Sequence, residues 1–202
     1  METIDSGLSR LGLAVVEKMN ALRMIVDLSH SSDVTCTQAL DASKRPCIVS
    51  HGGCRALFAS PRNRTDAQLR KLADTGGYFG VFQMTRWLTA RPVSSVEDVI
   101  DHIDHAVKIG GIDLVGFGSD QPIEGDPTPQ AEKVAELADW QQHNAGIPGA
   151  DPLHGHVTAA DLDKPDRMRI LAAALERRGY GGDRLDKIMG GNFRRVFADV
   201  CG

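Results

Sequence analysis

Four side chains in this sequence have the chemistry of a hydrolytic centre: His30, His51, Arg62 and Asp120. Histidine is the commonest metal ligand in proteins, and two neutral imidazoles can converge on one zinc ion. A carboxylate such as Asp120 can carry a proton to or from a metal-bound water. The planar guanidinium of Arg62 suits the recognition of a carboxylate. Together these residue types favour metal-assisted hydrolysis of an amide bond in a small acidic molecule.

Short apolar runs predict that three of these residues lie at one edge of a sheet. We expect strands at residues 24–28, 47–51, 78–82 and 113–118. His30, His51 and Asp120 each close or follow one of these strands. The carboxyl ends of parallel strands are where α/β folds, and TIM barrels above all, build their active sites.

Segments with helical spacing of apolar residues separate the expected strands. The expected helices span residues 8–22, 33–43, 66–74 (capped by Thr65), 96–107, 130–142, 166–178, 183–189 and 193–200. Strands that alternate with helices predict a parallel sheet covered by helices, here in a single domain over residues 1–202. A complete barrel needs eight strands and usually about 250 residues, whereas four strands are expected.

The composition excludes several classes of protein. The 202 residues carry a formal net charge of −4 with both signs interspersed, unlike a nucleic-acid binder with a basic patch. No run of roughly 18 or more apolar residues occurs, so we expect no membrane span. The start lacks the features of a secretory signal, and the four cysteines show no CxxC spacing. We therefore expect reduced thiols and a cytoplasmic protein.

Other titratable residues have less specific interpretations. His102 and His105 fall opposite the apolar stripe of their helix and are interpreted as solvated. His154 and His156 lie in a loop rich in proline and glycine, where they are a weaker candidate for a metal-binding or pocket-lining pair. Asp27 is either a partner that orients a metal ligand or a structural carboxylate, and both interpretations stay open.

The segments around the four candidates resemble the membrane dipeptidase family (renal dipeptidase, peptidase M19). The resemblance extends from about residue 7 to residue 200, nearly the whole chain, and the intervals between the four candidates also match. The segments that carry it are 24–30, 49–51, 60–63, 115–120 and 190–197.

This resemblance implies a TIM-barrel-like (β/α)8 metallohydrolase fold and a zinc-dependent dipeptidase with two zinc ions bridged by a hydroxide. His30 and His51 would be ligands of the second zinc. Arg62 would bind the terminal carboxylate of a dipeptide substrate. Asp120 would contact the substrate and carry a proton between the attacking water and the leaving amine.

The sequence also departs from the family pattern. Members carry a His-x-Asp pair and a bridging Glu on strands that precede the one ending at His30, whereas only 23 residues precede Met24 here. We therefore expect the C-terminal four strands of the barrel and their helices, with the first-site ligands missing. Two histidines leave zinc short of three or four protein ligands, so we expect weak activity or none from this chain alone. Open sheet edges would favour a homo-oligomer.

A second departure follows Asp120, where Gln121-Pro122-Ile123 replaces an aromatic residue, an acid and a glycine. The loop over residues 121–165 on the substrate side is therefore altered. Two alternatives remain: another metal-dependent barrel amidohydrolase, or a non-catalytic half-barrel fragment. Arg62 discriminates between the hydrolases, because a dipeptidase needs it beside the metal and available to a carboxylate.

Overall fold

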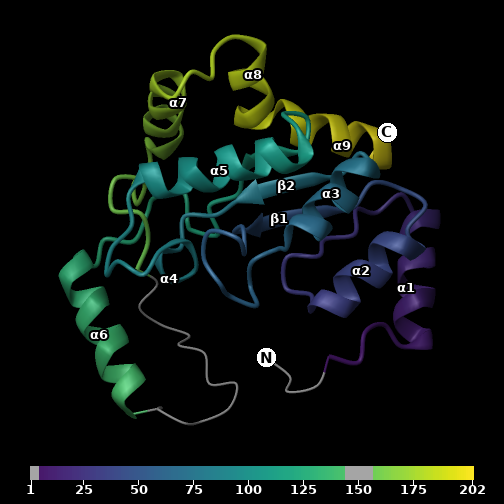
Figure 1. Ribbon diagram of the computed structural model, residues 1–202, viewed down its shortest axis with the longest axis horizontal. Coiled ribbons are helices and arrows are strands. Elements are labelled where there is room, and N and C mark those ends of the chain that lie inside the picture. Colours follow the sequence, from purple (N-terminus) through teal and green to yellow (C-terminus); the bar gives the residue numbers. More distant parts are fainter. Residues whose placement is uncertain (1–4, 144–156) are drawn as a thin grey trace.

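Three parallel strands form the centre of the fold. The computed structural model describes residues 5–143 and 157–202. The sheet has the order β1–β2–β3 and helices lie around it (Figure 1). Its strands are β1 (Ile48–Gly52), β2 (Tyr78–Val81) and β3 (Val115–Phe117). This arrangement confirms the expected α/β class with a parallel sheet.

The expected strand over residues 24–28 is wrong, because only a single bridge joins Asp27 to Ile48 of β1. Leu28 N donates to Ile48 O at 2.8 Å, and Ile48 N donates to Val26 O at 2.9 Å. The next amide, Ser50 N, donates to the Asp27 carboxylate instead of to the neighbouring backbone. The side chain of Asp27 thus competes with the ladder and ends the pairing.

All eight expected helices are present, and the short helix α4 was not predicted. The helices are α1 (Arg10–Ala21), α2 (Asp33–Ala42), α3 (Asp66–Asp74), α4 (Thr85–Leu88), α5 (Val96–Gly110), α6 (Gln130–His143), α7 (Arg167–Arg177), α8 (Asp183–Asp186), η1 (Lys187–Gly191) and α9 (Asn192–Cys201). Thr65 caps α3 as expected, in a capping box with Gln68. Within the described residues, no helix combines the length and apolar character needed to cross a bilayer.

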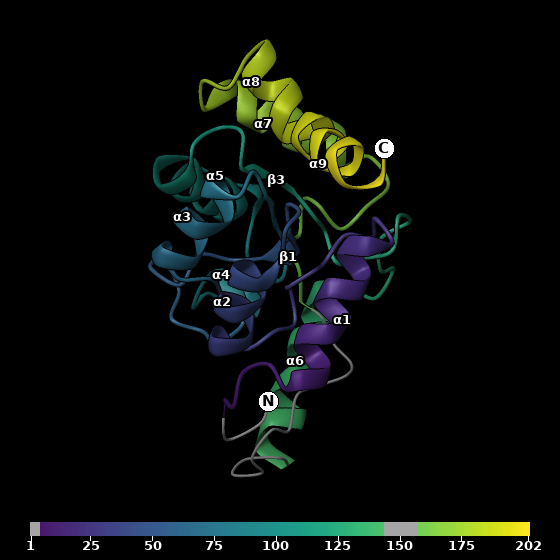
Figure 2. The ribbon, with the colours of Figure 1, turned by 90° about the vertical axis from the view of Figure 1, so that its right-hand side faces the viewer.

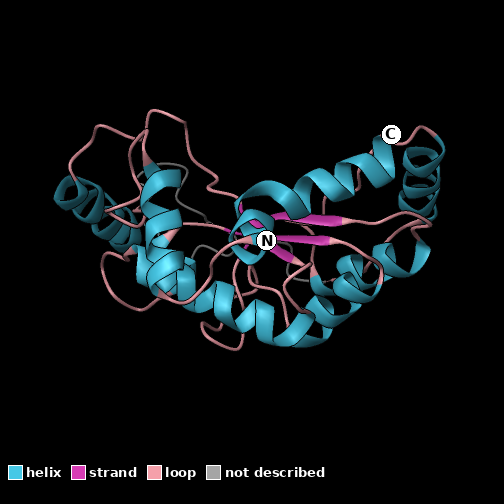
Figure 3. Cartoon of the chain, turned by 90° about the horizontal axis from the view of Figure 1, so that it is seen from above, coloured by secondary structure: helices cyan, strands magenta, loops and turns pink. Residues whose placement is uncertain are grey.

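The two faces of the sheet pack against different helices (Figures 2 and 3). Val49 and Phe79 belong to the main core, which also contains buried side chains of α2, α3 and α5. Their neighbours Ile48 and Tyr78 belong to a smaller cluster with Val196 of α9. This division follows from the two-residue period of a strand, which sends successive side chains to opposite faces.

Helix α9 fastens the amino ends of the strands, because its Arg195 bonds to the turns before β2 and β3. The guanidinium donates to Gly76 O at 2.7 Å, to Gly77 O at 3.1 Å and to Asp113 O at 3.0 Å. The carboxyl ends of the strands, where the predicted catalytic residues lie, are therefore at the opposite edge of the sheet from α9.

Side chains cover the outer edge of β3. Asn192 Nδ2 donates to Val115 O at 2.8 Å, and Tyr78 Oη donates to Phe117 O at 3.1 Å. Leu114 O faces β2 and accepts from Phe79 N, so the carbonyls of Val115 and Phe117 face away from β2. Two outward carbonyls of this edge strand are thus hydrogen-bonded without a neighbouring strand.

Candidate functional site

The two candidate histidines face each other. His30 lies in the turn between Leu28 and α2, and His51 lies in β1. Their Nε2 atoms are 2.9 Å apart, and their rings meet edge to face with centroids 4.9 Å apart. Both imidazoles therefore present the same ring nitrogen to one point at the carboxyl edge of the sheet.

Asp120 reaches this point from the loop after β3. Its Oδ2 lies 3.8 Å from His51 Nε2. The backbone of Asp120 is left-handed, with φ of 56°, which is uncommon for a residue other than glycine. The side chain stays 37% exposed, so it can exchange protons with solvent.

Arg62 lies beside the imidazole pair and is held on several sides. Its Nη1 donates to Ser29 O, and its Nη2 lies 3.4 Å from His30 Nε2. The guanidinium also lies over the Trp87 ring, 5.0 Å from the centroid, and Trp87 in turn stacks on Phe82. These contacts keep a largely buried, planar cation next to the two histidines.

The surroundings favour the neutral form of His51. Burial lowers its pKa, Asp120 opposes this, and Arg62 and His30 lower it further, so the net shift is downward. A neutral imidazole is the form that binds a metal ion.

Asp27 proves to be connected to His51 through a serine. Its carboxylate accepts hydrogen bonds from Ser29 and Ser50, and Ser50 Oγ lies 2.9 Å from His51 Nδ1. Partial desolvation raises the pKa of Asp27, but the hydrogen bonds from Ser50 and Ser29 outweigh it and lower the pKa overall. Sequence reasoning weighed Asp27 but missed both serines, which carry no signal of their own in a strand-end motif.

Trp87 is a third residue that sequence reasoning missed, because no pattern in the sequence distinguishes it from a packing residue. It lies in α4, which is too short to show a helical period. Asn63 Nδ2 donates to Trp87 O at 2.7 Å and to Phe58 O at 2.8 Å. Asn63 thus ties the Arg62 loop to the helix on which Arg62 stacks.

The interpretation of His102 as solvated is wrong, because the residue is only 1% exposed. Cys54 N donates to His102 Nδ1 at 2.8 Å, and His102 Nε2 lies 3.1 Å from Leu88 O. His105 is also partly buried and pairs with Asp66 at 2.7 Å. The part of α5 that carries His102 and His105 is therefore covered as well as its apolar stripe. Three charged side chains of the same helix stay exposed: Glu97, Asp101 and Lys108. His154 and His156 lie outside the described residues.

The imidazole pair fits a zinc ion by donor type but not by number. Zinc in proteins takes three or four protein ligands, and His30 and His51 supply two. In the part of the chain that the structure describes, no group of three or more His, Cys, Asp or Glu side chains could hold a metal ion. The described residues therefore supply two of the three or four donors that a zinc ion would need.

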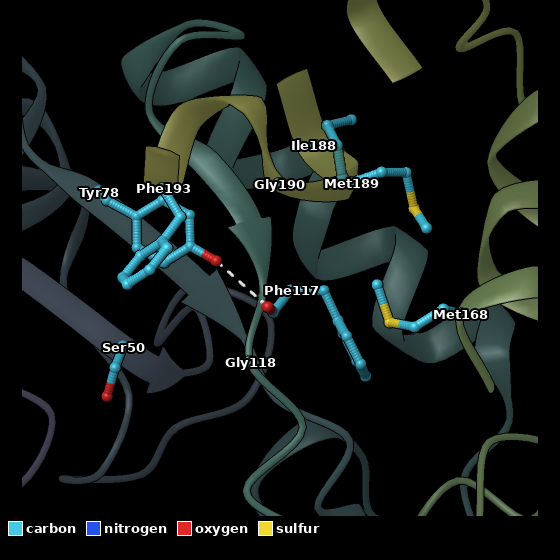
Figure 4. Close-up of a pocket in the computed structure, with 9 residues that line it drawn as sticks. All are labelled: Ser50, Tyr78, Phe117, Gly118, Met168, Ile188, Met189, Gly190 and Phe193. Atoms are coloured by element: carbon cyan, nitrogen blue, oxygen red, sulfur yellow. Dashed lines mark hydrogen bonds between the residues drawn. The ribbon is translucent and has the colours of Figure 1, made fainter. Parts of the chain in front are cut away.

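A separate cavity of about 300 Å³ lies between the sheet and the C-terminal helices (Figure 4). Its lining is mainly apolar and comprises Ser50, Tyr78, Phe117, Gly118, Met168, Ile188, Met189, Gly190 and Phe193. His30, His51, Arg62 and Asp120 do not line it, so the candidate centre lies outside this cavity.

Comparison with curated proteins identifies relatives of the whole chain. Dipeptidase verJ of Clonostachys rogersoniana is 31% identical over 194 residues, which cover 96% of this chain and 42% of that protein. Dipeptidase 3 of Rattus norvegicus is 30% identical over 195 residues, covering 96% of this chain and 34% of that protein. The chain thus spans about two fifths or less of the length of these curated relatives.

Solved structures share the fold. An amidohydrolase from Pseudomonas aeruginosa superposes with a TM-score of 0.80 at 29% identity, covering 98% of this chain and 58% of that one. A metallopeptidase from Rhodobacter sphaeroides, bound to a phosphinate mimic of the dipeptide L-Ala-D-Ala, superposes with a TM-score of 0.75 at 23% identity. The match covers 96% of this chain and 47% of that one. The second likeness shows the fold alone.

A family model agrees with these similarities. The model for membrane dipeptidase (peptidase family M19) matches residues 1–140, more than half of the chain. The resemblance seen in the sequence is thereby confirmed: the chain belongs to the membrane dipeptidase family, peptidase family M19.

Proposed function

We propose that this chain carries the substrate-binding and proton-transferring part of a zinc-dependent dipeptidase centre, which hydrolyses the peptide bond of dipeptides. The observation that supports it is the convergence of four distant residues at one sheet edge. His30 and His51 meet at 2.9 Å, Arg62 lies 3.4 Å from His30, and Asp120 lies 3.8 Å from His51.

His30 and His51 would hold a zinc ion through their Nε2 atoms. When bound, zinc supplies an attacking water of lowered pKa and polarises the scissile carbonyl. Because the pair supplies only two ligands, we propose that the complete centre needs ligands beyond the described residues. Weak activity, or none, is then the expectation for these 202 residues alone.

Arg62 would bind the terminal carboxylate of the substrate. Its guanidinium is fixed by Ser29 O and the Trp87 ring, so little side-chain entropy remains to be lost on binding. A carboxylate placed there puts the peptide bond one residue away, next to the imidazole pair. This position favours a dipeptidase over an amidohydrolase whose substrates lack a terminal carboxylate.

Asp120 would move the proton. Its carboxylate lies close enough to His51 to share the reacting region, and it keeps contact with solvent. It would take a proton from the attacking water and give it to the leaving amine.

Metal binding by the histidines can be tested by calorimetric titration of the purified chain with zinc. His30→Ala and His51→Ala should each weaken zinc binding by more than about tenfold. Loss of a residue that only supports a metal ligand already weakens binding by about tenfold or more, so loss of a ligand should cost at least as much. His143→Ala is the matched control, because His143 is exposed on α6 and should leave the affinity unchanged. Zinc binding that neither candidate histidine affects would contradict the proposal.

Substrate recognition can be tested without turnover. In the presence of zinc, a dipeptide with a free terminal carboxylate should bind about 10- to 100-fold more tightly than its amide. Arg62→Met should abolish this preference, whereas Arg86→Met, which removes the other guanidinium over Trp87, should preserve it. Equal affinity for the two dipeptides in the unaltered chain would rule out a carboxylate-binding role for Arg62.

A further inference from the structure

We propose that Asp27, Ser29 and Ser50 form a positioning relay that keeps the proton of neutral His51 on Nδ1. The lone pair of Nε2 then faces the candidate metal site. This inference rests on the proposed function in so far as His51 is taken as a metal ligand. The three residues touch no substrate and act through His51.

The hydrogen bonds to Asp27 account for both hydroxyl protons. Oδ1 accepts from Ser29 N at 3.0 Å, from Ser29 Oγ at 2.7 Å and from Ser50 N at 3.1 Å. Oδ2 accepts from Ser50 Oγ at 2.5 Å. An ionised carboxylate only accepts, so the two short contacts at 2.7 Å and 2.5 Å assign both hydroxyl protons to Asp27. The longer 2.9 Å contact between Ser29 Oγ and Ser50 Oγ is then left without a proton.

With its proton committed, Ser50 Oγ can only accept from the imidazole. The 2.9 Å contact between Ser50 Oγ and His51 Nδ1 is therefore a hydrogen bond in which Nδ1–H donates. The opposite arrangement would leave Ser50 Oγ facing Asp27 Oδ2 at 2.5 Å without a proton between the two oxygens. Their lone pairs would then repel, so the relay selects one tautomer.

Ser29 holds the backbone of the same residue. His51 N donates to Ser29 Oγ at 3.1 Å, the hydroxyl whose proton goes to Asp27. One carboxylate thus orients both the ring and the main chain of His51. Ser50 N also bonds to Asp27 rather than to the backbone beside it, so one backbone hydrogen bond between the two segments is missing next to this histidine.

The tautomer of His30 follows from that of His51. Two nitrogens 2.9 Å apart need one proton between them, and His51 Nε2 carries none. In the metal-free chain we expect His30 Nε2–H to donate to His51 Nε2 across the shorter contact. The 3.4 Å contact of Arg62 Nη2 with His30 Nε2 is then not a hydrogen bond, because a guanidinium can only donate. For His30 to present its Nε2 lone pair to a zinc ion, this proton would have to move to His30 Nδ1. Metal-binding histidines commonly donate their other ring N–H to a carboxylate, directly or through a neighbour, which raises the basicity of the ligand.

The tautomers can be read directly from long-range proton–nitrogen NMR correlations. The spectra are recorded on the metal-free chain at a pH where imidazoles are neutral, and His30→Gln and His51→Gln assign the signals. We expect the Nδ1–H form for His51 and the Nε2–H form for His30. An Nε2–H form of His51 in the unaltered chain would overturn the proposal.

Variants of Ser50 separate positioning from folding. Ser50→Ala should shift His51 toward the Nε2–H form, and Ser50→Thr, which keeps a hydroxyl, should restore Nδ1–H. Ser31→Ala is the control, because its hydroxyl donates to Leu28 O and to no part of the relay. A Ser50→Ala chain that is folded and keeps the Nδ1–H form would overturn the relay, as would failure of Ser50→Thr to restore that form.

Zinc affinity supplies a second readout. Ser50→Ala and Asp27→Asn should weaken zinc binding about 10- to 100-fold, and Ser50→Thr should stay close to the unaltered chain. Unchanged zinc affinity in both of the first two variants would overturn the positioning role. Because the NMR measurement uses no metal, a chain with the expected tautomers that binds no zinc would contradict the proposed function and not the relay.

Discussion

Asp120 has a backbone conformation that most residues avoid. Asparagine and aspartate tolerate the left-handed region better than other residues with a β-carbon, because their short polar side chains can bond locally. The same turn brings its carboxylate to within 3.8 Å of His51. Two separate requirements, the backbone conformation and the proposed proton transfer, thus restrict the residue at this position.

Substitution of Asp120 should separate the two requirements. Asp120→Asn should change the free energy of unfolding by less than about 0.5 kcal/mol, whereas Asp120→Ala should lower it by about 1 kcal/mol through the left-handed backbone. Both should leave zinc affinity unchanged and abolish residual dipeptide hydrolysis. Urea denaturation and zinc titration measure these effects. Equal destabilisation by Asn and Ala would refute the backbone argument.

The sequence was sufficient to find His30, His51 and Asp120, since polar residues at the ends of apolar strands identify the edge where they meet. Arg62 was found by its side-chain chemistry and its segment's resemblance to the family. The roles of all four stay predictions. Ser50 and Trp87 could not be found in this way. The contact of Ser50 with Asp27 crosses between chain segments 23 residues apart, and Trp87 acts through a stacking partner from another loop. Such roles depend on tertiary contacts that no local pattern encodes.

At the scale of elements, helical periodicity located all eight expected helices. Helices such as α3 and α5 present an apolar stripe to the core, whereas in the described chain α6 buries only Lys133 and α8 buries no side chain. Periodicity failed where a side chain competes with the backbone, as Asp27 does beside β1, and where an element is a single turn, as in α4. It also failed for α5, whose second side meets the loop after β1 through His102 and Cys54. Periodicity identifies one buried face and cannot show that part of another face is covered too.

The burial of His102 in α5 predicts a pH dependence of stability. Burial lowers its pKa from the ordinary value of 6.5, so the unfolded chain takes up a proton more readily than the folded one. The contribution of neutral, buried His102 to the free energy of unfolding is complete above about pH 6.5 and is lost as the pH falls below that value. His102→Gln should destabilise the protein at pH 8 and reduce the further loss between pH 6.5 and pH 5. Parallel pH profiles of the free energy of unfolding in the two proteins would contradict this prediction.

Across the whole molecule, the amino and carboxyl ends of the strands differ in what they contact. The amino ends are fastened by Arg195 of α9, and the carboxyl ends bring together residues from four separate segments. Two of those residues, His30 and His51, come from segments joined by one backbone bridge and by the hydrogen bonds of Asp27 and Ser29. A metal ion held by both histidines would add a further link between these segments.

Zinc should accordingly raise the melting temperature. A ligand at 100 times its dissociation constant, bound only by the folded chain, adds about 2.7 kcal/mol, which corresponds to about 5–10 °C for a protein of this length. Differential scanning calorimetry with zinc, and then with excess EDTA, measures the shift and its reversal. His51→Ala should remove most of it. An equal shift in His51→Ala would place the stabilising ion elsewhere.

The tyrosine hydroxyl and asparagine amide along β3 have a consequence for misassembly. An exposed edge strand presents unpaired backbone groups with which a second polypeptide can pair, and such pairing is a common route to fibrils. Here a second strand that pairs with β3 must first break the hydrogen bonds of Tyr78 with Phe117 O and of Asn192 with Val115 O, at a cost of about 1 kcal/mol for each bond. These two side chains therefore oppose the addition of a strand from another molecule to the β3 edge.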